Sequence, residues 1–259
     1  MAEPYDVSSP PSGHPALAAT DAGAVHVETS TKRVRAMLAG HVVADSAQPL
    51  LVWERPHHPA YYFPRQDVRT ELIGPAERTE HRAGLGEAHL HTLKLGEREA
   101  PEGVITYPDS PIERLRDHVR FRWKAVDSWF EEDEEIYVHP RDPYTRIDIL
   151  VSSRHVRAAI GGVMIAESHQ PRLLFETNVP TRCYLPKIDV RMDLLEPSET
   201  RTRCPYKGTA EYYSARIGDT LHPDVAWSYR TPFPESQKIA GLIAFHDEKA
   251  DLIVDDVRH

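Results

Sequence analysis

The hydrophobic positions of this chain come in short runs rich in Val, Ile and Leu, broken by Gly, Pro or Asp. Runs of this length, bounded by turn-forming residues, are typical of β-strands. Two pairs of such runs flank Ala39-Gly40 and Gly161-Gly162, which predicts tight hairpins because glycine accepts the positive φ of these turns. We expect further strands at 50–54, 173–176, 212–217, 226–229, 242–246 and 252–254.

The pattern repeats along the chain. The segment "VRAMLAGHVVADSAQPLLVWE" (34–54) matches "VRAAIGGVMIAESHQPRLLFE" (156–176) at a constant shift of 122 residues, 156 − 34. The same shift continues without gaps as far as Tyr107, which falls opposite Tyr229. A register held over this length indicates a duplicated domain; a solenoid needs three or more shorter repeats.

The duplication divides the chain into two homologous units, 26–143 and 146–259, which we expect to pack as an internal pseudo-dimer. Residues 1–25 are rich in Pro, Ser and Ala and predict a flexible tail without the pattern of a signal peptide. Helix is scarce: 111–118 and 234–241 each predict one short helix, opened by proline and acidic residues. The expected fold class is therefore mainly β, with one short helix in each unit.

Composition narrows the function classes. The net charge of −9 argues against a general nucleic-acid-binding protein, and no apolar run approaches the roughly 20 residues of a membrane span. The only cysteines, Cys183 and Cys204, form no Cys-x-x-Cys pair, so we expect no structural zinc and a reducing, cytoplasmic setting. His89 and His91 share one face of a predicted strand, but no third ligand is identifiable by spacing, so we predict no metal site.

The two units differ most at "RTRCPYKGTAEYYS" (201–214), where the first unit has "RAGLG" opposite "CPYKG". We therefore expect the polar chemistry to belong to the second unit and the first unit to carry a degenerate site. Matching residues such as Glu54 and Glu176 are equally compatible with a structural role, as paired buried charges.

Lys207 is the central candidate in this stretch. Its ammonium group could bind an anion or act as an acid or base in a partly desolvated pocket, although a solvated turn lysine fits the same pattern. Cys204 is a candidate nucleophile if a nearby cation supports its thiolate, and otherwise a small apolar residue. Tyr229 and Trp227 alternate with the strand period and, with Tyr212, could form either an aromatic wall or part of the core.

Three further residues complete the predicted site. Glu235 begins the second predicted helix, where it could cap the helix or serve as a general acid or base aimed at the pocket. Arg157 would contact a substrate anion if its strand borders the site. Tyr206, next to Lys207, is the remaining candidate for substrate binding.

The segments "DVRMDLLEPSETRTRCPYKGTAEYYS", "AWSYRTPFPE" and "IAGLIAFHDEKADLIVD" resemble the family called domain of unknown function 427, in its tandem bacterial form. The resemblance runs from about residue 30 to the end and implies a tent-type β fold, similar to Mss4-like proteins and methionine sulfoxide reductase B. Those fold relatives hold zinc through Cys-x-x-Cys motifs that this chain lacks. Family catalogues add a nucleotidyltransferase label, but the chain has no Gly-Ser followed by spaced aspartates for two magnesium ions.

Two functions remain open. The first is a cofactor-independent enzyme of lyase, isomerase or hydrolase type, acting on a small organic or anionic metabolite in the second unit. The second is a non-catalytic ligand-binding or regulatory module that uses the same pocket. The sequence does not choose between a monomer and a homodimer.

Overall fold

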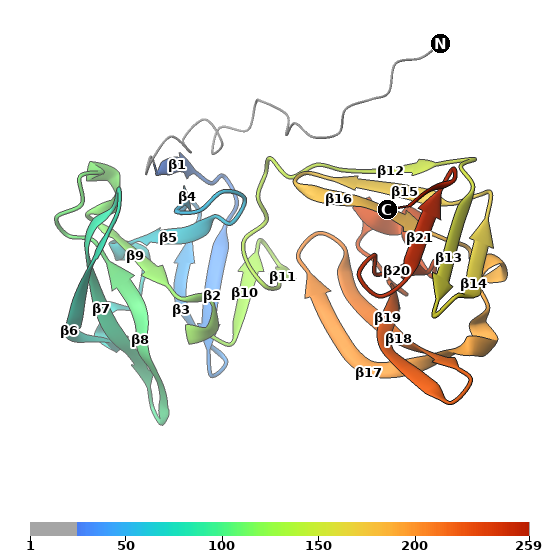
Figure 1. Cartoon of the computed structure of the whole chain (residues 1–259). Helices are drawn as coiled ribbons and strands as arrows, with labels where there is room; N and C mark the ends of the chain where they lie inside the picture. The colour runs from blue at the N-terminus through green and yellow to red at the C-terminus, as the bar shows by residue number, and fades with distance from the viewer. Residues whose placement is uncertain (1–24, 259) are drawn as a thin grey trace, which may run out of the picture. The chain divides into compact units, whose positions relative to one another are not determined.

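The computed structural model describes residues 25–258, and the chain divides into two compact units between Tyr144 and Thr145 (Figure 1). This division falls at the joint between the two predicted repeats. The predicted N-terminal tail lies outside the described residues, apart from Val25.

Short β-strands dominate both units. The first unit contains β1 His26–Thr29, β2 Val34–Leu38, β3 His41–Ser46, β4 Leu50–Trp53, β5 Ala60–Pro64, β6 Ile73–Arg82, β7 Gly86–Leu95, β8 Arg98–Thr106, β9 His118–Phe121, β10 Ser128–Glu131 and β11 Glu134–Ile136. The second contains β12 Ile147–Val151, β13 Val156–Ile160, β14 Val163–Ser168, β15 Arg172–Glu176, β16 Val179–Tyr184, β17 Leu195–Cys204, β18 Gly208–Ile217, β19 Thr220–Ser228, β20 Ala244–Phe245, β21 Asp251–Val254 and β22 Val257–Arg258.

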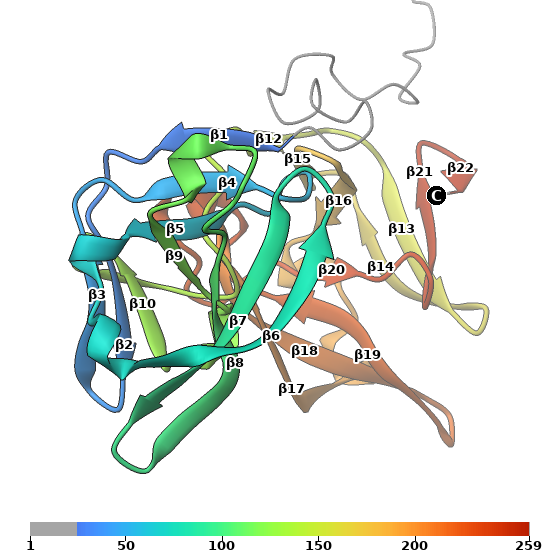
Figure 2. The same cartoon turned by 90° about the vertical axis from the view of Figure 1, so that its left-hand side faces the viewer.

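In the first unit, one antiparallel sheet has the strand order β1-β4-β5-β9-β8-β7-β6, and a second has the order β11-β10-β2-β3 (Figure 2). The two sheets enclose the main core, because side chains alternate between the faces of each strand. Tyr61 and Phe63 point into this core with Trp129 of the second sheet. Tyr62, between them, packs with Leu90 on the opposite face of the large sheet, in a smaller apolar cluster.

The second unit arranges the corresponding strands in three sheets, ordered β12-β15-β16, β14-β13-β21-β22 and β17-β18-β19-β20. In Figure 1 the long strands β17 to β19 curve below β12, β15 and β16. The first and third sheets meet through an isolated bridge between Leu185 and Ile243. One core includes Ile165 and Val225, and a second, smaller cluster contains Tyr184, Trp227 and Tyr229.

Both predicted hairpins form. Ala39 and Gly40 join β2 to β3, while Gly161 and Gly162 join β13 to β14, and all four residues have positive φ. This is the backbone of the tight turns that match the twist of two antiparallel strands.

Seven helical segments occur within residues 25–258, and all of them are 3₁₀-helices: η1 Arg65–Asp67, η2 Thr70–Leu72, η3 Glu113–Leu115, η4 Trp123–Ala125, η5 Lys187–Asp189, η6 Met192–Leu194 and η7 Pro234–Ile239. The prediction of one short helix per unit therefore overestimated the helical content, since these segments are single 3₁₀ turns or little longer. His118, which we expected to end the first helix, instead begins β9. Neither η3 nor η7 has a side-chain cap, and segments this short gain little from helix propagation.

Candidate functional site

The "CPYKG" segment is the turn between β17 and β18, in which Cys204 pairs with Gly208. Gly208 has a φ of +97°, and the Lys207 carbonyl accepts a hydrogen bond from the Phe233 backbone at 3.2 Å. These contacts hold the turn against the chain that leads into η7. Lys207 is therefore not a solvated turn residue: it is only 9 % exposed.

The Lys207 ammonium forms an ion pair and hydrogen bond with Glu176, at the end of β15. The Glu176 side chain is 8 % exposed, so both charges have lost most of their hydration. Charges buried to this degree are retained in proteins when they are paired. The pair lies where the tyrosines of the smaller apolar cluster also gather, since the charge of Glu176 contributes to the raised pKa of both Tyr184 and Tyr229.

Tyr229 and Trp227 share this cluster with Tyr184. The Trp227 indole nitrogen donates a hydrogen bond to the Tyr184 hydroxyl at 3.1 Å. Burial is the main cause that raises the pKa of both tyrosines, so each hydroxyl stays protonated and can donate. The Tyr229 hydroxyl is therefore a protonated donor that lies close enough to Glu176 for the carboxylate charge to contribute to its raised pKa, after burial.

Tyr212 lies at the edge of this cluster. Its ring stacks on His246, with centroids 6.0 Å apart, and the His246 ring lies 4.5 Å from Trp227. The Arg182 guanidinium lies 5.8 Å from the Trp227 ring and pairs with Asp247. Burial lowers the pKa of His246, which favours the neutral imidazole. Sequence reasoning missed His246 and Arg182, because neither belongs to a motif.

The two cysteines differ in environment. Cys204 ends β17 and is partly exposed, and it adds to the raised pKa of Tyr184 and Tyr229, so it belongs to the same group. Cys183 is buried, and its burial raises the pKa of the thiol to about 11.

We predict that iodoacetamide at pH 8 alkylates Cys204 well before Cys183. The raised pKa alone lowers the thiolate fraction of Cys183 by about 100-fold relative to a thiol of pKa 9. Peptide mapping of the folded and the urea-unfolded chain measures both rates, and the difference should vanish on unfolding. Equal rates in the folded chain would contradict the prediction.

Neither Arg157 nor Glu235 takes part in the ion pair of Lys207 and Glu176. Arg157 lies on β13, in a different sheet from the Lys207 turn, and its guanidinium pairs with Asp256 at 2.5 Å. Glu235 lies in the first turn of η7, exposed and without a capping hydrogen bond. Tyr206 is half-buried in the turn itself, and its carbonyl oxygen accepts a hydrogen bond from Ser236.

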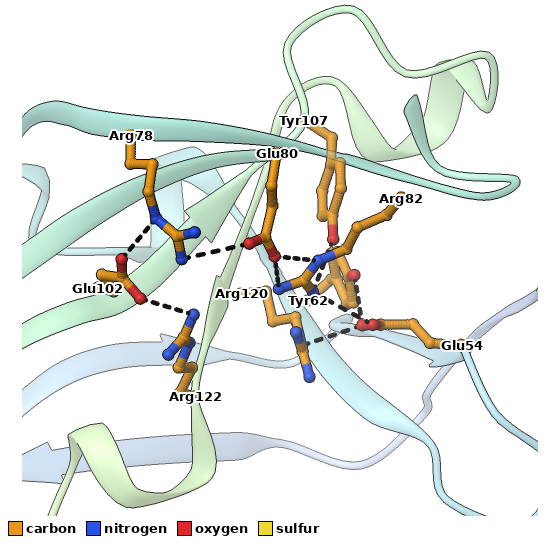
Figure 3. Close-up of polar contacts among 9 residues, drawn as sticks. All are labelled: Glu54, Tyr62, Arg78, Glu80, Arg82, Glu102, Tyr107, Arg120 and Arg122. Atoms are coloured by element: carbon orange, nitrogen blue, oxygen red, sulfur yellow. Dashed lines mark hydrogen bonds and ion pairs between the residues drawn. The ribbon is translucent and has the colours of Figure 1, made fainter. Parts of the chain in front are cut away.

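The first unit contains its own polar centre, built on the counterparts of Glu176, Tyr184 and Tyr229 (Figure 3). The Tyr62 hydroxyl donates to Glu54 at 2.7 Å, and Tyr107 is fully buried next to it. Burial, followed by the charge of Glu54, raises the pKa of both tyrosines. The shared glutamate and tyrosines thus occupy equivalent sites in both units.

The cations of the two units differ. In the first unit Leu85 stands opposite Lys207, and Glu54 is flanked instead by Arg82 at 3.6 Å and Arg120 at 3.0 Å. Arg82 also donates to the Tyr107 hydroxyl at 3.1 Å.

The ion-pair network of the first unit extends along β6 (Figure 3). Glu80 binds both Arg82 at 2.7 Å and Arg78 at 3.2 Å, and Glu102 joins Arg78 at 2.7 Å to Arg122 at 3.2 Å. Sequence reasoning missed this network, although the 122-residue register placed Arg82 opposite Cys204. The register did not extend to Arg120, whose strand pairing matches that of Ala244.

We also searched the described residues for a metal site and for a membrane-spanning helix. Within the described residues no three His, Cys, Asp or Glu side chains are grouped to hold a metal ion. Both ring nitrogens of His91 lie 3.0 Å from protein oxygens, of Gly74 and Thr106. None of the helices between residues 25 and 258 has the length and apolarity needed to cross a membrane.

Fold and site together define a protein of two homologous, mainly β domains, each with a partly or fully buried glutamate that lies near two tyrosines and is paired with one or two cations. A family model matches the chain twice, over residues 26–132 and 148–256. The chain therefore belongs to the family described as domain of unknown function (DUF427), in a tandem, two-copy form. No curated protein matches it significantly.

Proposed function

We propose that the second unit binds a small organic or anionic metabolite beside Lys207 and transforms it without a tightly bound cofactor. The observation that carries the proposal is the buried pair of Lys207 and Glu176 near the buried, protonated hydroxyl of Tyr229. A proton carrier, its charged partner and a hydroxyl donor are groups that acid–base chemistry uses.

The roles follow from the contacts. Lys207 would exchange a proton with the substrate or stabilise negative charge that develops on it, and Glu176 would balance the lysine. Tyr229 would donate a hydrogen bond to a substrate oxygen, and Trp227 and Tyr212 would form the wall against which the substrate lies. Cys204 is the alternative nucleophile of the same group. Chemistry of the lyase, isomerase or hydrolase type fits these groups.

One observation favours the second candidate function, a non-catalytic ligand-binding or regulatory module. The first unit keeps the glutamate and both tyrosines as Glu54, Tyr62 and Tyr107 but has no lysine among them. Because the glutamate and the tyrosines recur without the lysine, they can serve to bind a ligand or to stabilise the fold, and neither role requires catalysis.

The finer features of the fold are part of the same proposal. We place both units in the tent class of β folds, since each has a hairpin-rich sheet that curves over a small second core. The unpaired state of Cys183 and Cys204 fits a reducing, cytoplasmic compartment. Pseudo-dimeric packing of the units and the oligomeric state of the chain remain predictions.

A metabolite screen on the full chain tests the proposal, with binding followed by thermal shift and conversion followed by NMR. For a compound that is converted, Lys207→Met should lower kcat/KM by at least about 100-fold, the usual contribution of a proton-transfer group. Lys187→Met, at an exposed lysine of the same unit, is the matched control and should leave turnover within twofold. Lys207→Met combined with Glu176→Gln removes both charges and separates loss of chemistry from loss of stability.

Two outcomes contradict the enzyme. Turnover that survives Lys207→Met would remove Lys207 from the mechanism. A ligand recovered unchanged after long incubation, with binding that also survives Lys207→Met, would favour the binding module.

A further inference from the structure

The polar centre of the first unit contains an arginine, Arg120, whose donors are not all used by the ion pairs of the network. Arg120 lies on β9, a central strand, with its backbone paired to Tyr62 on one side and Ile105 on the other. Its side chain is only 21 % exposed. An arginine in this position needs partners for its donors, because burying an unpaired polar group is costly.

Most donors of Arg120 lack a partner. Its Nε atom lies 3.0 Å from Glu54, but the geometry does not make a hydrogen bond. The two terminal nitrogens make no hydrogen bond to any residue from 25 to 258, and they are not among the fully buried atoms. In Figure 3 they point away from Glu54. Solvent or a ligand can therefore reach them.

The ion-pair network around Arg120 has more positive than negative charges. The network of Figure 3 contains four arginines and three glutamates, a net charge of 4 − 3 = +1. The arginines are Arg78, Arg82, Arg120 and Arg122, and the glutamates are Glu54, Glu80 and Glu102. Glu54 also accepts the Tyr62 hydrogen bond and lies beside Arg82, so Arg120 shares this carboxylate with two other side chains.

The second unit shows that this arginine is not required by the fold. Ala244 occupies the position of Arg120, because it pairs with Trp227 as Arg120 pairs with Ile105, and it is buried in the corresponding apolar cluster. Cys204 occupies the position of Arg82. The cationic surplus is therefore particular to the first unit.

We propose that the first unit binds the oxyanion of a small molecule, a carboxylate or a phosphate, on the terminal nitrogens of Arg120. The planar guanidinium offers two parallel N–H donors that match such a group bidentately. Glu54 lies at the Nε edge of Arg120, and the network keeps the remaining arginines paired, so the ligand meets the terminal nitrogens of a single arginine. The first unit is then a second binding site with its own specificity, not a degenerate copy.

The test compares the full chain with Arg120→Leu, which removes the charge and puts an apolar side chain where the second unit has the buried Ala244. Arg122→Leu is the matched control, because Arg122 lies two residues away, outside the Glu54 contacts, and pairs with Glu102. Acetate and inorganic phosphate are titrated separately, against sodium chloride at equal ionic strength. Binding is followed through arginine side-chain NMR signals, and folding of each variant is checked by circular dichroism.

We expect saturable binding of at least one anion, weakened at least tenfold by Arg120→Leu and less than twofold by Arg122→Leu. The tighter of the two probes identifies the class of oxyanion. If Arg120→Leu does not fold, Arg120→Gln removes the charge while keeping a polar side chain, and the same loss is expected. Absence of saturable binding in the natural chain, or equal binding after substitution of Arg120, overturns the proposal.

Discussion

Replacing Glu176 with leucine is expected to destabilise the second unit by about 3–5 kcal/mol, the usual cost of leaving one member of a buried ion pair uncompensated. Lys207 is 9 % exposed, and its ammonium donates to Glu176. Without the carboxylate, the lysine must stay charged in a poorly hydrated site or leave the turn. Urea unfolding, with hydrogen exchange to resolve the two units, measures the loss.

The double variant Glu176→Leu with Lys207→Leu is the control. It removes both charges, and the first unit already has Leu85 at the position of Lys207. Replacing a whole buried pair by apolar residues is often neutral, so we expect the double variant to recover most of the lost stability. A single substitution that costs less than about 1 kcal/mol, or a double variant no more stable than the single, would show that the pair is effectively solvated.

The second large effect concerns Gly103, on β8 of the first unit. The repeat places Val225 at the equivalent position, which makes a larger residue look acceptable. The structure predicts the opposite, because a Cβ atom at Gly103 would lie 2.8 Å from the Ala100 carbonyl oxygen and 2.9 Å from the Ala125 methyl group. Gly103→Ala should therefore cost about 1–3 kcal/mol, as expected for overpacking that moves the backbone.

Gly74→Ala is the matched control in the same sheet. A Cβ atom there meets only the Thr92 carbonyl oxygen, at an ordinary contact distance of 3.5 Å. Its effect on the free energy of unfolding should stay within about 0.5 kcal/mol. If both substitutions change the free energy of unfolding by the same small amount, the prediction is wrong, and the backbone around Gly103 shifts at little cost to accommodate a Cβ atom.

Much of the fold could be predicted because its signals are local. The Gly-containing turns at 39–40 and 161–162 and the short apolar runs at 50–54 and 173–176 require only neighbouring residues to be recognised. The short helices were less well predicted. Whether a segment forms a 3₁₀ turn or an α-helix depends on where the next strand begins, and this is set by tertiary pairing. His118 joins β9 and so ends the first helical segment early.

The candidate site was predicted only in part. Lys207, Tyr229 and Trp227 were chosen from one turn and one strand, and the structure brings them together with Glu176. Arg157 was chosen on the condition that β13 borders the site, and that condition depended on sheet order, which no local pattern contains.

By itself the sequence determined that this protein is a duplicated, mainly β chain, because a 122-residue register and a two-residue side-chain period are properties read along the chain. Only the tertiary structure decided which cation pairs with each of the two equivalent glutamates. Lys207 is 31 residues from Glu176, and Arg120 is 66 residues from Glu54 (120 − 54). Contacts at these separations follow from strand order and from which face each side chain occupies, and a shift of one residue in register reverses that face.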